Sequence, residues 1–234
     1  MRAAGAGVVV VSWYPPGRAD QKAGRFAGFQ DRQVPMLAVA AVRAGLELAF
    51  HAEPYPGRTA AAAAADVELL CERHGALPGV HRRAGPRGLL PLVYVYDSYL
   101  VGPREWAAQL GRGLPAYLLG LAVERAHLEQ LRAAGFDGAY SYFASDGFVW
   151  GSTAANWPEM GRFCRQHGLM SAILGSSPCL SLPLSSGGSL VQVQDTTTRG
   201  CGRGTGARRG SGARGRISTK CWRRRRAATR RRWV

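Results

Sequence analysis

The stretch LELAFHAEPY, residues 46–55, decides the fold class. It begins as a mostly apolar run and ends by placing a histidine, a glutamate and a tyrosine within five residues. A largely apolar run of this length is typical of a strand buried on both faces, as in a parallel sheet. Its polar end predicts a strand that leaves the core at a surface where a ligand is bound.

The same unit, an apolar strand followed by an amphipathic helix, recurs on both sides of this stretch. Residues 7–18, 90–99 and 136–148 have the composition of further strands and their loops. Segments with helical spacing separate them, at residues 34–45, 66–75, 102–113, 124–135 and 156–168. Such alternation predicts an α/β fold with a parallel sheet covered by helices. Residues 111–124 are a short connection, which predicts that one strand of the sheet is missing there.

Polar and aromatic residues at several strand ends favour a (β/α)8 barrel of the TIM type over an open sheet. They are Trp13, Tyr14, His51, Glu53, Tyr55, Asp97, Tyr99, Tyr142 and Asp146. No strand is followed by a glycine-rich phosphate-binding loop, so a dinucleotide or P-loop site has no support. Aromatic rings beside carboxylates suit a sugar, because its CH faces stack on rings while its hydroxyls need acceptors.

Each of these residues also has a structural interpretation. Trp13 and Tyr14 could be packing residues at the rim, and His51 alone could be a hydrogen-bonded core histidine. Asp146 lies in Ser-Asp-Gly, which is equally typical of a turn. Glu53 is harder to explain structurally, because a carboxylate directly after a buried strand needs partners or a ligand.

Charge and cysteine content narrow the function classes. Residues 1–198 carry 17 Lys and Arg against 15 acidic residues, whereas residues 199–234 carry 14 Lys and Arg and no acid. The Gly, Ser and Arg-rich stretch 175–234 is therefore expected to be a disordered basic tail, with residues 1–174 as the folded domain. The five cysteines lack the spacing of a zinc site, and we expect neither a metal nor another cofactor.

Five blocks of the sequence resemble glycoside hydrolase family 99, the endo-α-1,2-mannosidases, and most closely the endomannosidase-like paralogues of vertebrates. The blocks are VVVVSWYPP, FHAEPY, LPLVYVYDSY, GFDGAYSYFASDGFVWGS and NWPEMGRFCRQHGL. The resemblance implies a (β/α)8 barrel on the lumenal side of the Golgi membrane, held by an N-terminal anchor. It also implies cleavage of internal α-1,2-mannosidic bonds in glucosylated high-mannose N-glycans. The start of this sequence, MRAAGAGVVVVSW, is too short an apolar block to be such an anchor.

By matching motif, nine residues are expected to line the sugar-binding cleft: Trp13, Tyr14, His51, Glu53, Tyr96, Asp97, Tyr99, Tyr142 and Asp146. The family's catalytic carboxylates belong to a later Asn-Glu-Trp-His-Glu-Gly motif, which this sequence does not contain. After Glu159 its one acid is Asp195. Because glycoside hydrolysis needs two carboxyl groups, we expect no complete catalytic pair in this chain.

Three functions remain open: an endomannosidase product without its full catalytic machinery, a non-catalytic mannoside binder, and an arginine-rich protein that binds nucleic acid through its tail. The last is the least expected, because the tail lacks regularly interleaved aromatic residues. A barrel normally needs about 250 residues, so closure is also in doubt. We expect unpaired strand edges at residues 8–12 and near Gly168.

Overall fold

The computed structural model describes residues 7–17, 29–143, 145–176 and 190–195. They all belong to one compact unit, residues 1–200. The basic segment 199–234, on which the nucleic-acid hypothesis depends, lies outside the described residues.

The strands form one curled sheet in which most neighbours are parallel. They are β1 (Val8–Trp13), β2 (Glu47–Ala52), β3 (Arg82–Gly85), β4 (Gly88–Val95), β5 (Tyr117–Leu121), β6 (Gly138–Phe143), β7 (Met170–Ser176) and β8 (Leu190–Asp195). Strands β1, β2, β4, β5, β6 and β7 pair in parallel, in the order β1–β2–β4–β5–β6–β7. This is the arrangement of a partial (β/α)8 barrel, with β3 added as an antiparallel hairpin partner of β4.

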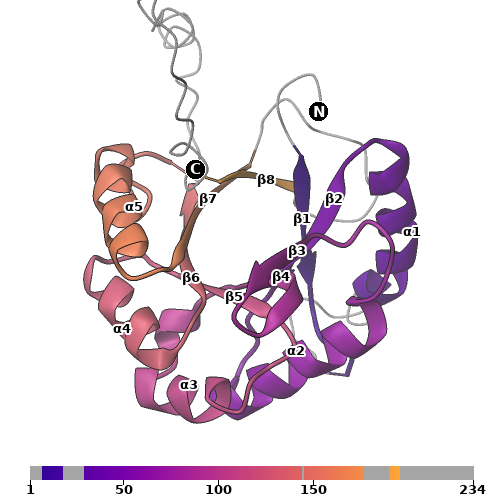
Figure 1. The fold of residues 1–234 in the computed structure, drawn as a ribbon, viewed down its shortest axis with the longest axis horizontal. Coiled ribbons are helices and arrows are strands. Elements are labelled where there is room, and N and C mark those ends of the chain that lie inside the picture. The colour runs from indigo at the N-terminus through magenta and orange to yellow at the C-terminus, as the bar shows by residue number, and fades with distance from the viewer. Residues whose placement is uncertain (1–6, 18–28, 144, 177–189, 196–234) are drawn as a thin grey trace, which may run out of the picture. The chain divides into compact units, whose positions relative to one another are not determined.

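Five helices connect the parallel strands and lie along the outside of the ring (Figure 1). They are α1 (Phe29–Arg43), α2 (Ala60–His74), α3 (Pro103–Leu110), α4 (Ala126–Ala134) and α5 (Trp157–Gln166), with short 3-10 turns at Ser98–Leu100 and Ala154–Asn156. Helix α2 shows why one of them begins where it does: the Thr59 side chain accepts a hydrogen bond from the Ala62 amide at 3.1 Å, an ordinary N-cap.

Strand β8 pairs antiparallel with both β7 and β1, so the hydrogen bonding runs around a complete ring of the described strands (Figure 1). The predicted unpaired edges at residues 8–12 and near Gly168 are therefore wrong. Strand β8 also lies inside the stretch 175–234 that was assigned to a disordered tail. Its sequence, LVQVQD, alternates apolar and polar residues as a strand does, a signal that the surrounding Gly, Ser and Arg obscured.

Strand β5 corrects a second expectation, because residues 111–124 do contain a barrel strand. Its five residues, YLLGL, pair with β4 on one side and β6 on the other. Gly120 lies against α4, where an added Cβ would come within 2.1 Å of the Leu131 side chain. The connection from the end of α3 at Leu110 to the start of β5 at Tyr117 is short, and it is sufficient to place β5 in the sheet.

Alternate residues of each strand point into the ring or out toward the helices. The inner cluster consists of Val10, Ala49, Leu92, Tyr94, Leu119, Leu121, Tyr140, Met170, Ala172 and Leu174. The outer cluster joins the other strand faces, including Val9, Val11 and Trp13, to the buried sides of the helices. The sheet is thus buried on both faces, which explains the largely apolar runs in the sequence.

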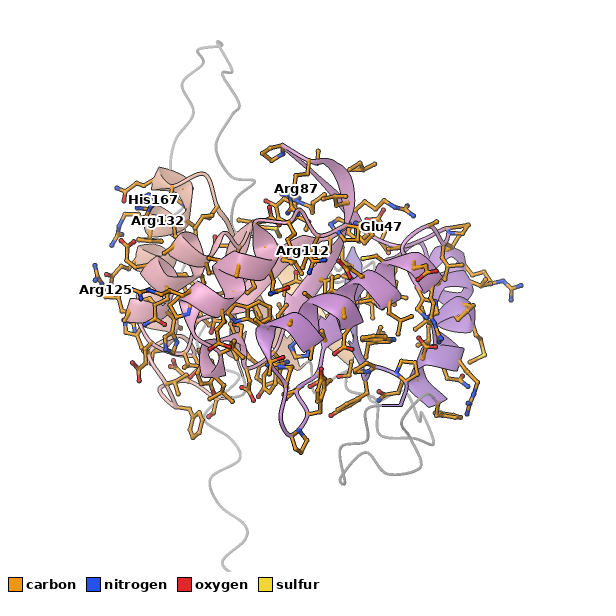
Figure 2. The ribbon with its side chains drawn as sticks, turned by 90° about the horizontal axis from the view of Figure 1, so that it is seen from below. Glu47, Arg87, Arg112, Arg125, Arg132 and His167 are labelled. Carbon is orange, nitrogen blue, oxygen red and sulfur yellow. The ribbon has the colours of Figure 1, made fainter. Side chains whose placement is uncertain are left out.

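The amino-terminal end of the ring is closed by polar contacts from the β3–β4 hairpin. Arg87 donates to the carbonyl oxygens of Leu114 and Ala116 and to the carboxylate of Asp137, which also accepts the Leu118 amide. Figure 2 shows Arg87 and Glu47 together at this end, with Arg125 and Arg132 on the helical exterior. These polar contacts stabilise the fold at the amino-terminal end of the ring. In barrels of this type, ligands bind at the opposite end, where the parallel strands terminate.

Within the described part of the chain, no helix is long and apolar enough to cross a membrane.

Candidate functional site

The residue at the centre of the candidate site is His51, near the end of β2. The residue is only 4% exposed, and its side chain lies in the ring between two partners. Its Nδ1 lies 2.8 Å from Glu53 Oε1, and its Nε2 lies 2.9 Å from the Tyr140 hydroxyl. A carboxylate accepts, so Nδ1 donates to Glu53; in the tautomer with its proton on Nδ1, Nε2 accepts the Tyr140 O–H.

Tyr140 keeps its proton in this arrangement. Burial raises the pKa of Tyr140 well above its ordinary value, and the negative charges of Glu53 and Asp97 raise it further. A protonated phenol donates to the imidazole and holds its orientation. The chain Tyr140–His51–Glu53 therefore fixes the position of the largely buried Glu53 carboxylate, which is 12% exposed and retains a second oxygen able to accept hydrogen bonds.

Two half-buried tyrosines lie beside this chain. The Tyr96 ring is centred 5.0 Å from that of His51, and the Tyr142 ring is centred 6.0 Å from Tyr96 in an edge-to-face arrangement. Tyr94 and Tyr140 continue the stack toward the core, 5.1 Å apart. Together, His51, Glu53, Tyr96, Tyr140 and Tyr142 form what we call the strand-end group. It offers ring faces, hydroxyls and one carboxylate at the carboxyl end of the parallel strands.

Asp97 follows Tyr96 in a left-handed backbone conformation, with φ 50° and ψ 33°. It is the one non-glycine residue with positive φ among the described residues. Such a conformation costs most residues of order 1 kcal/mol, although Asp adopts it more readily than most, and it occurs both in turns and at functional sites. Burial and then the Asp97 charge raise the pKa of Tyr96, which places this carboxylate close to the strand-end group.

Tyr99 lies next along the same loop and packs against a histidine that the sequence analysis did not select. The rings of Tyr99 and His127 are stacked, with centres 5.1 Å apart and planes inclined by 11°. His127 Nδ1 accepts from the amides of Val123 and Glu124, both at 3.3 Å, in the loop that follows β5. Tyr99 thus belongs to the rim, where it connects the loops after β4 and β5.

The structure places three other expected residues away from the strand-end group or at its edge. Trp13 is fully buried in the outer cluster, where its Nε1 donates to Asp31 at 3.0 Å. The period of two explains this, because Val9, Val11 and Trp13 share the outward face of β1. Asp146 is exposed and accepts the Ala154 amide at 2.9 Å, which is the turn interpretation. Tyr14 is half-buried just beyond β1.

Sequence analysis missed Tyr140 and Arg58. Tyr140 lies two residues before Tyr142 on the same strand and so shares its face, a signal that was available from the period of two. Arg58 lies in the loop after β2, and its guanidinium donates to the Tyr96 carbonyl oxygen. Nothing in the local sequence predicts that contact, because it joins residues 38 positions apart. Within the described ranges, no three His, Cys, Asp or Glu side chains are placed to hold a metal ion.

Chemically, the strand-end group is suited to a neutral polyol. Its rings can stack on CH faces, its hydroxyls can donate or accept, and Glu53 can accept from two hydroxyls of a ligand. Carbohydrate is the ligand class with all three features.

Comparison with known proteins supports this assignment. The profile of glycosyl hydrolase family 99 matches residues 1–176. A glycoprotein endo-alpha-1,2-mannosidase-like protein of Danio rerio is 39% identical over 180 residues, covering 73% of this chain and 40% of the relative. The glycoprotein endo-alpha-1,2-mannosidase of Rattus norvegicus is 34% identical over 180 residues, with 73% and 38% covered. The chain thus spans about 40% of the length of these relatives.

A solved structure supports the fold directly. The GH99 endo-alpha-mannosidase of Bacteroides thetaiotaomicron, in complex with bis-tris-propane, superposes with a TM-score of 0.60 at 28% identity. The match covers 71% of this chain and 51% of the bacterial chain. The partial (β/α)8 barrel expected from the sequence is confirmed.

Proposed function

The chain belongs to glycosyl hydrolase family 99, and on this premise we propose that its strand-end group binds an α-linked mannoside of an N-glycan. The observation that carries the proposal is the buried chain Tyr140–His51–Glu53, which orients a carboxylate acceptor at the carboxyl end of the strands. The ligand we propose is the glucosylated high-mannose type, at an internal α-1,2-mannosidic bond. The names of the curated relatives, endo-alpha-1,2-mannosidase and endo-alpha-1,2-mannosidase-like, support that choice.

The proposal includes binding without cleavage by the chain as it stands. Hydrolysis of a glycosidic bond requires an acid and a base or nucleophile on either side of that bond. The sequence contains no Asn-Glu-Trp-His-Glu-Gly motif. The strand-end group has one carboxylate, Glu53, with Asp97 beside it, and one oxygen of Glu53 already accepts from His51. Release of mannose-containing product from a glucosylated N-glycan would contradict this part of the proposal and leave the binding part standing.

Calorimetric titration of the full chain with α-1,2-mannobiose tests the binding. Glu53→Gln removes the charge that orients His51, and Tyr140→Phe removes one hydroxyl while keeping the ring. We expect each to weaken binding by about tenfold or more, because Gln keeps an acceptor for His51 but loses the charge that strengthens hydrogen bonds from ligand hydroxyls, whereas Phe leaves His51 Nε2 without the Tyr140 hydroxyl. The matched control is Glu129→Gln, an exposed carboxylate on α4 whose partner is Arg132. Equal affinity in all four proteins would contradict the proposed site.

We also propose that the protein is located on the lumenal side of the Golgi membrane, where such glycans would be its ligands. The support is the resemblance of its five sequence blocks to the family. Co-localisation of the endogenous protein with a Golgi marker, by immunostaining, is the expected result, and a diffuse cytosolic distribution would contradict it.

A further inference from the structure

Arg58 is a largely buried cation that the strand-end group, as described so far, does not explain. It lies after the turn at Gly57, where φ is +73°, and directly before Thr59, the N-cap of α2. Its own amide donates to the Tyr55 carbonyl at 3.2 Å, and the Tyr55 hydroxyl donates to Asp66 on α2. The base of the Arg58 side chain is therefore held by α2 and by the loop after β2.

The guanidinium reaches across to the neighbouring strand, where it donates to the carbonyl oxygen of Tyr96. This carbonyl lies just past the end of the β2–β4 ladder, whose last paired residues are Ala52 and Val95. A backbone acceptor beyond the end of a ladder needs another donor, and Arg58 supplies it. The bond is charge-assisted, so it is stronger than an ordinary one.

The residue that follows this carbonyl is Asp97, in its left-handed conformation. The orientation of the Tyr96 carbonyl depends on the rotation of the peptide that joins the two residues. A donor fixed on that oxygen therefore holds the peptide, and with it the strained conformation that would otherwise relax. Burial lowers the pKa of Arg58, while the nearby charge of Asp97 raises it, so the cation and the carboxylate lie close together.

We propose that Arg58 is a positioning residue for ligand binding: it holds the Tyr96–Asp97 peptide so that the Tyr96 ring and the Asp97 carboxylate stay in place beside His51 and Glu53. This inference rests on the proposed function, because it assigns Arg58 to the mannoside site. A lysine would keep the charge but lack the planar guanidinium whose Nη2 donates to the Tyr96 carbonyl oxygen. If Arg58 served only to neutralise the charge of Asp97, a lysine would do so equally well.

The experiment measures α-1,2-mannobiose affinity of the full chain carrying Arg58→Ala, Arg58→Lys or Asp97→Asn, and of the Arg58→Ala/Asp97→Asn double variant. We expect Arg58→Ala to weaken binding by about tenfold and Arg58→Lys to restore only part of it. Part of this loss is expected to remain when Asp97→Asn is already present, because the Tyr96 ring still depends on the contact between Arg58 and the backbone carbonyl. Arg132→Ala is the control, since Arg132 is an exposed arginine paired with a side chain on α4 (Figure 2).

Amide hydrogen exchange tests the structural role of Arg58 without a ligand. The amides of Leu100 and Val101 donate to the carbonyls of Asp97 and Ser98, so they report on this turn. Faster exchange confined to these amides in Arg58→Ala supports the proposal. Unchanged affinity, or a loss that disappears in the Asp97→Asn background, overturns it. If the unaltered chain does not bind α-1,2-mannobiose, the proposed function fails. If, in addition, Arg58→Ala leaves the exchange of the Leu100 and Val101 amides unchanged, the role of Arg58 in holding the turn fails as well.

Discussion

At the scale of single residues, a second buried cluster of polar side chains lies outside the strand-end group and is centred on Asp31. Asp31, near the start of α1, is 5% exposed and accepts from three side chains. Trp13 donates at 3.0 Å, Arg73 at 2.6 Å and His74 at 2.7 Å. Burial alone would raise the pKa of Asp31, but these hydrogen bonds lower it below its ordinary value. One carboxylate thus connects β1, α1 and α2.

Asp31→Ala is predicted to lower the free energy of unfolding by about 3–5 kcal/mol, because it leaves two buried donors and a half-exposed arginine without their acceptor. Urea unfolding measures the change. Glu129→Ala is the comparison, since the exposed Glu129–Arg132 pair should be worth no more than about 0.5 kcal/mol. A difference between the two variants of less than about 1 kcal/mol would contradict the role given to Asp31.

At the scale of elements, the loop between β5 and α4 depends on the protonation state of His127. Its Nδ1 accepts two backbone amides, which only the unprotonated nitrogen can do. Burial lowers the pKa of His127 below its ordinary value, and the nearby Glu124 carboxylate opposes the shift. In the unfolded chain the same imidazole titrates near 6.5. Between the folded and unfolded pKa values the unfolded state therefore binds more protons.

Because the unfolded state binds more protons in this range, the free energy of unfolding increases with pH there. Stability contributed by His127 should rise as pH increases through about 6.5 and fall as pH decreases toward the lower pKa of the folded protein. Urea unfolding at pH 5 and pH 7, for the unaltered chain and for His127→Gln, isolates the effect. We expect a smaller pH dependence in the variant, and equal slopes would show that His127 does not contribute.

The elements themselves were predicted unequally from the sequence. Strands β1, β2, β4 and β6 have largely apolar sequences followed by polar residues. Their existence was therefore predictable, and so was the fact that their carboxyl ends lie at the site. The face that each side chain takes was not, because a strand buried on both faces shows no alternation. Trp13 was therefore expected at the cleft and points to the helices, whereas the face of Tyr140 was predictable from Tyr142, two residues later on the same strand. Contacts such as Arg58 with Tyr96 depend on which strands are neighbours, which local pattern does not specify.

At the scale of the whole molecule, closure of the ring depends on β8. Six residues pair with the free edge of β7 and with the free edge of β1. Without them both edges would present unpaired amides and carbonyls, which promote association between chains. Closure therefore depends on a segment that sequence composition alone assigned to the tail.

Two shortened chains test this. A chain ending at residue 199 retains β8 and is predicted to be monomeric, whereas one ending at residue 189 lacks it and is predicted to aggregate. Size-exclusion chromatography with light scattering distinguishes the two outcomes. Monomers of similar stability in both cases would show that β8 is dispensable for closure.

The direction of β8 determines which end of the ring remains accessible when the protein is immobilised through a linker after Asp195. Because β8 is antiparallel, its last residue, Asp195, pairs with Ala172 near the start of β7, so the chain leaves the ring at the end opposite the strand-end group. A linker attached after Asp195 begins on the side of the hairpin that carries Arg87. Immobilising the protein through such a linker should leave a glycan array free to reach the other end, whereas attachment at the loop after β2 would obstruct it.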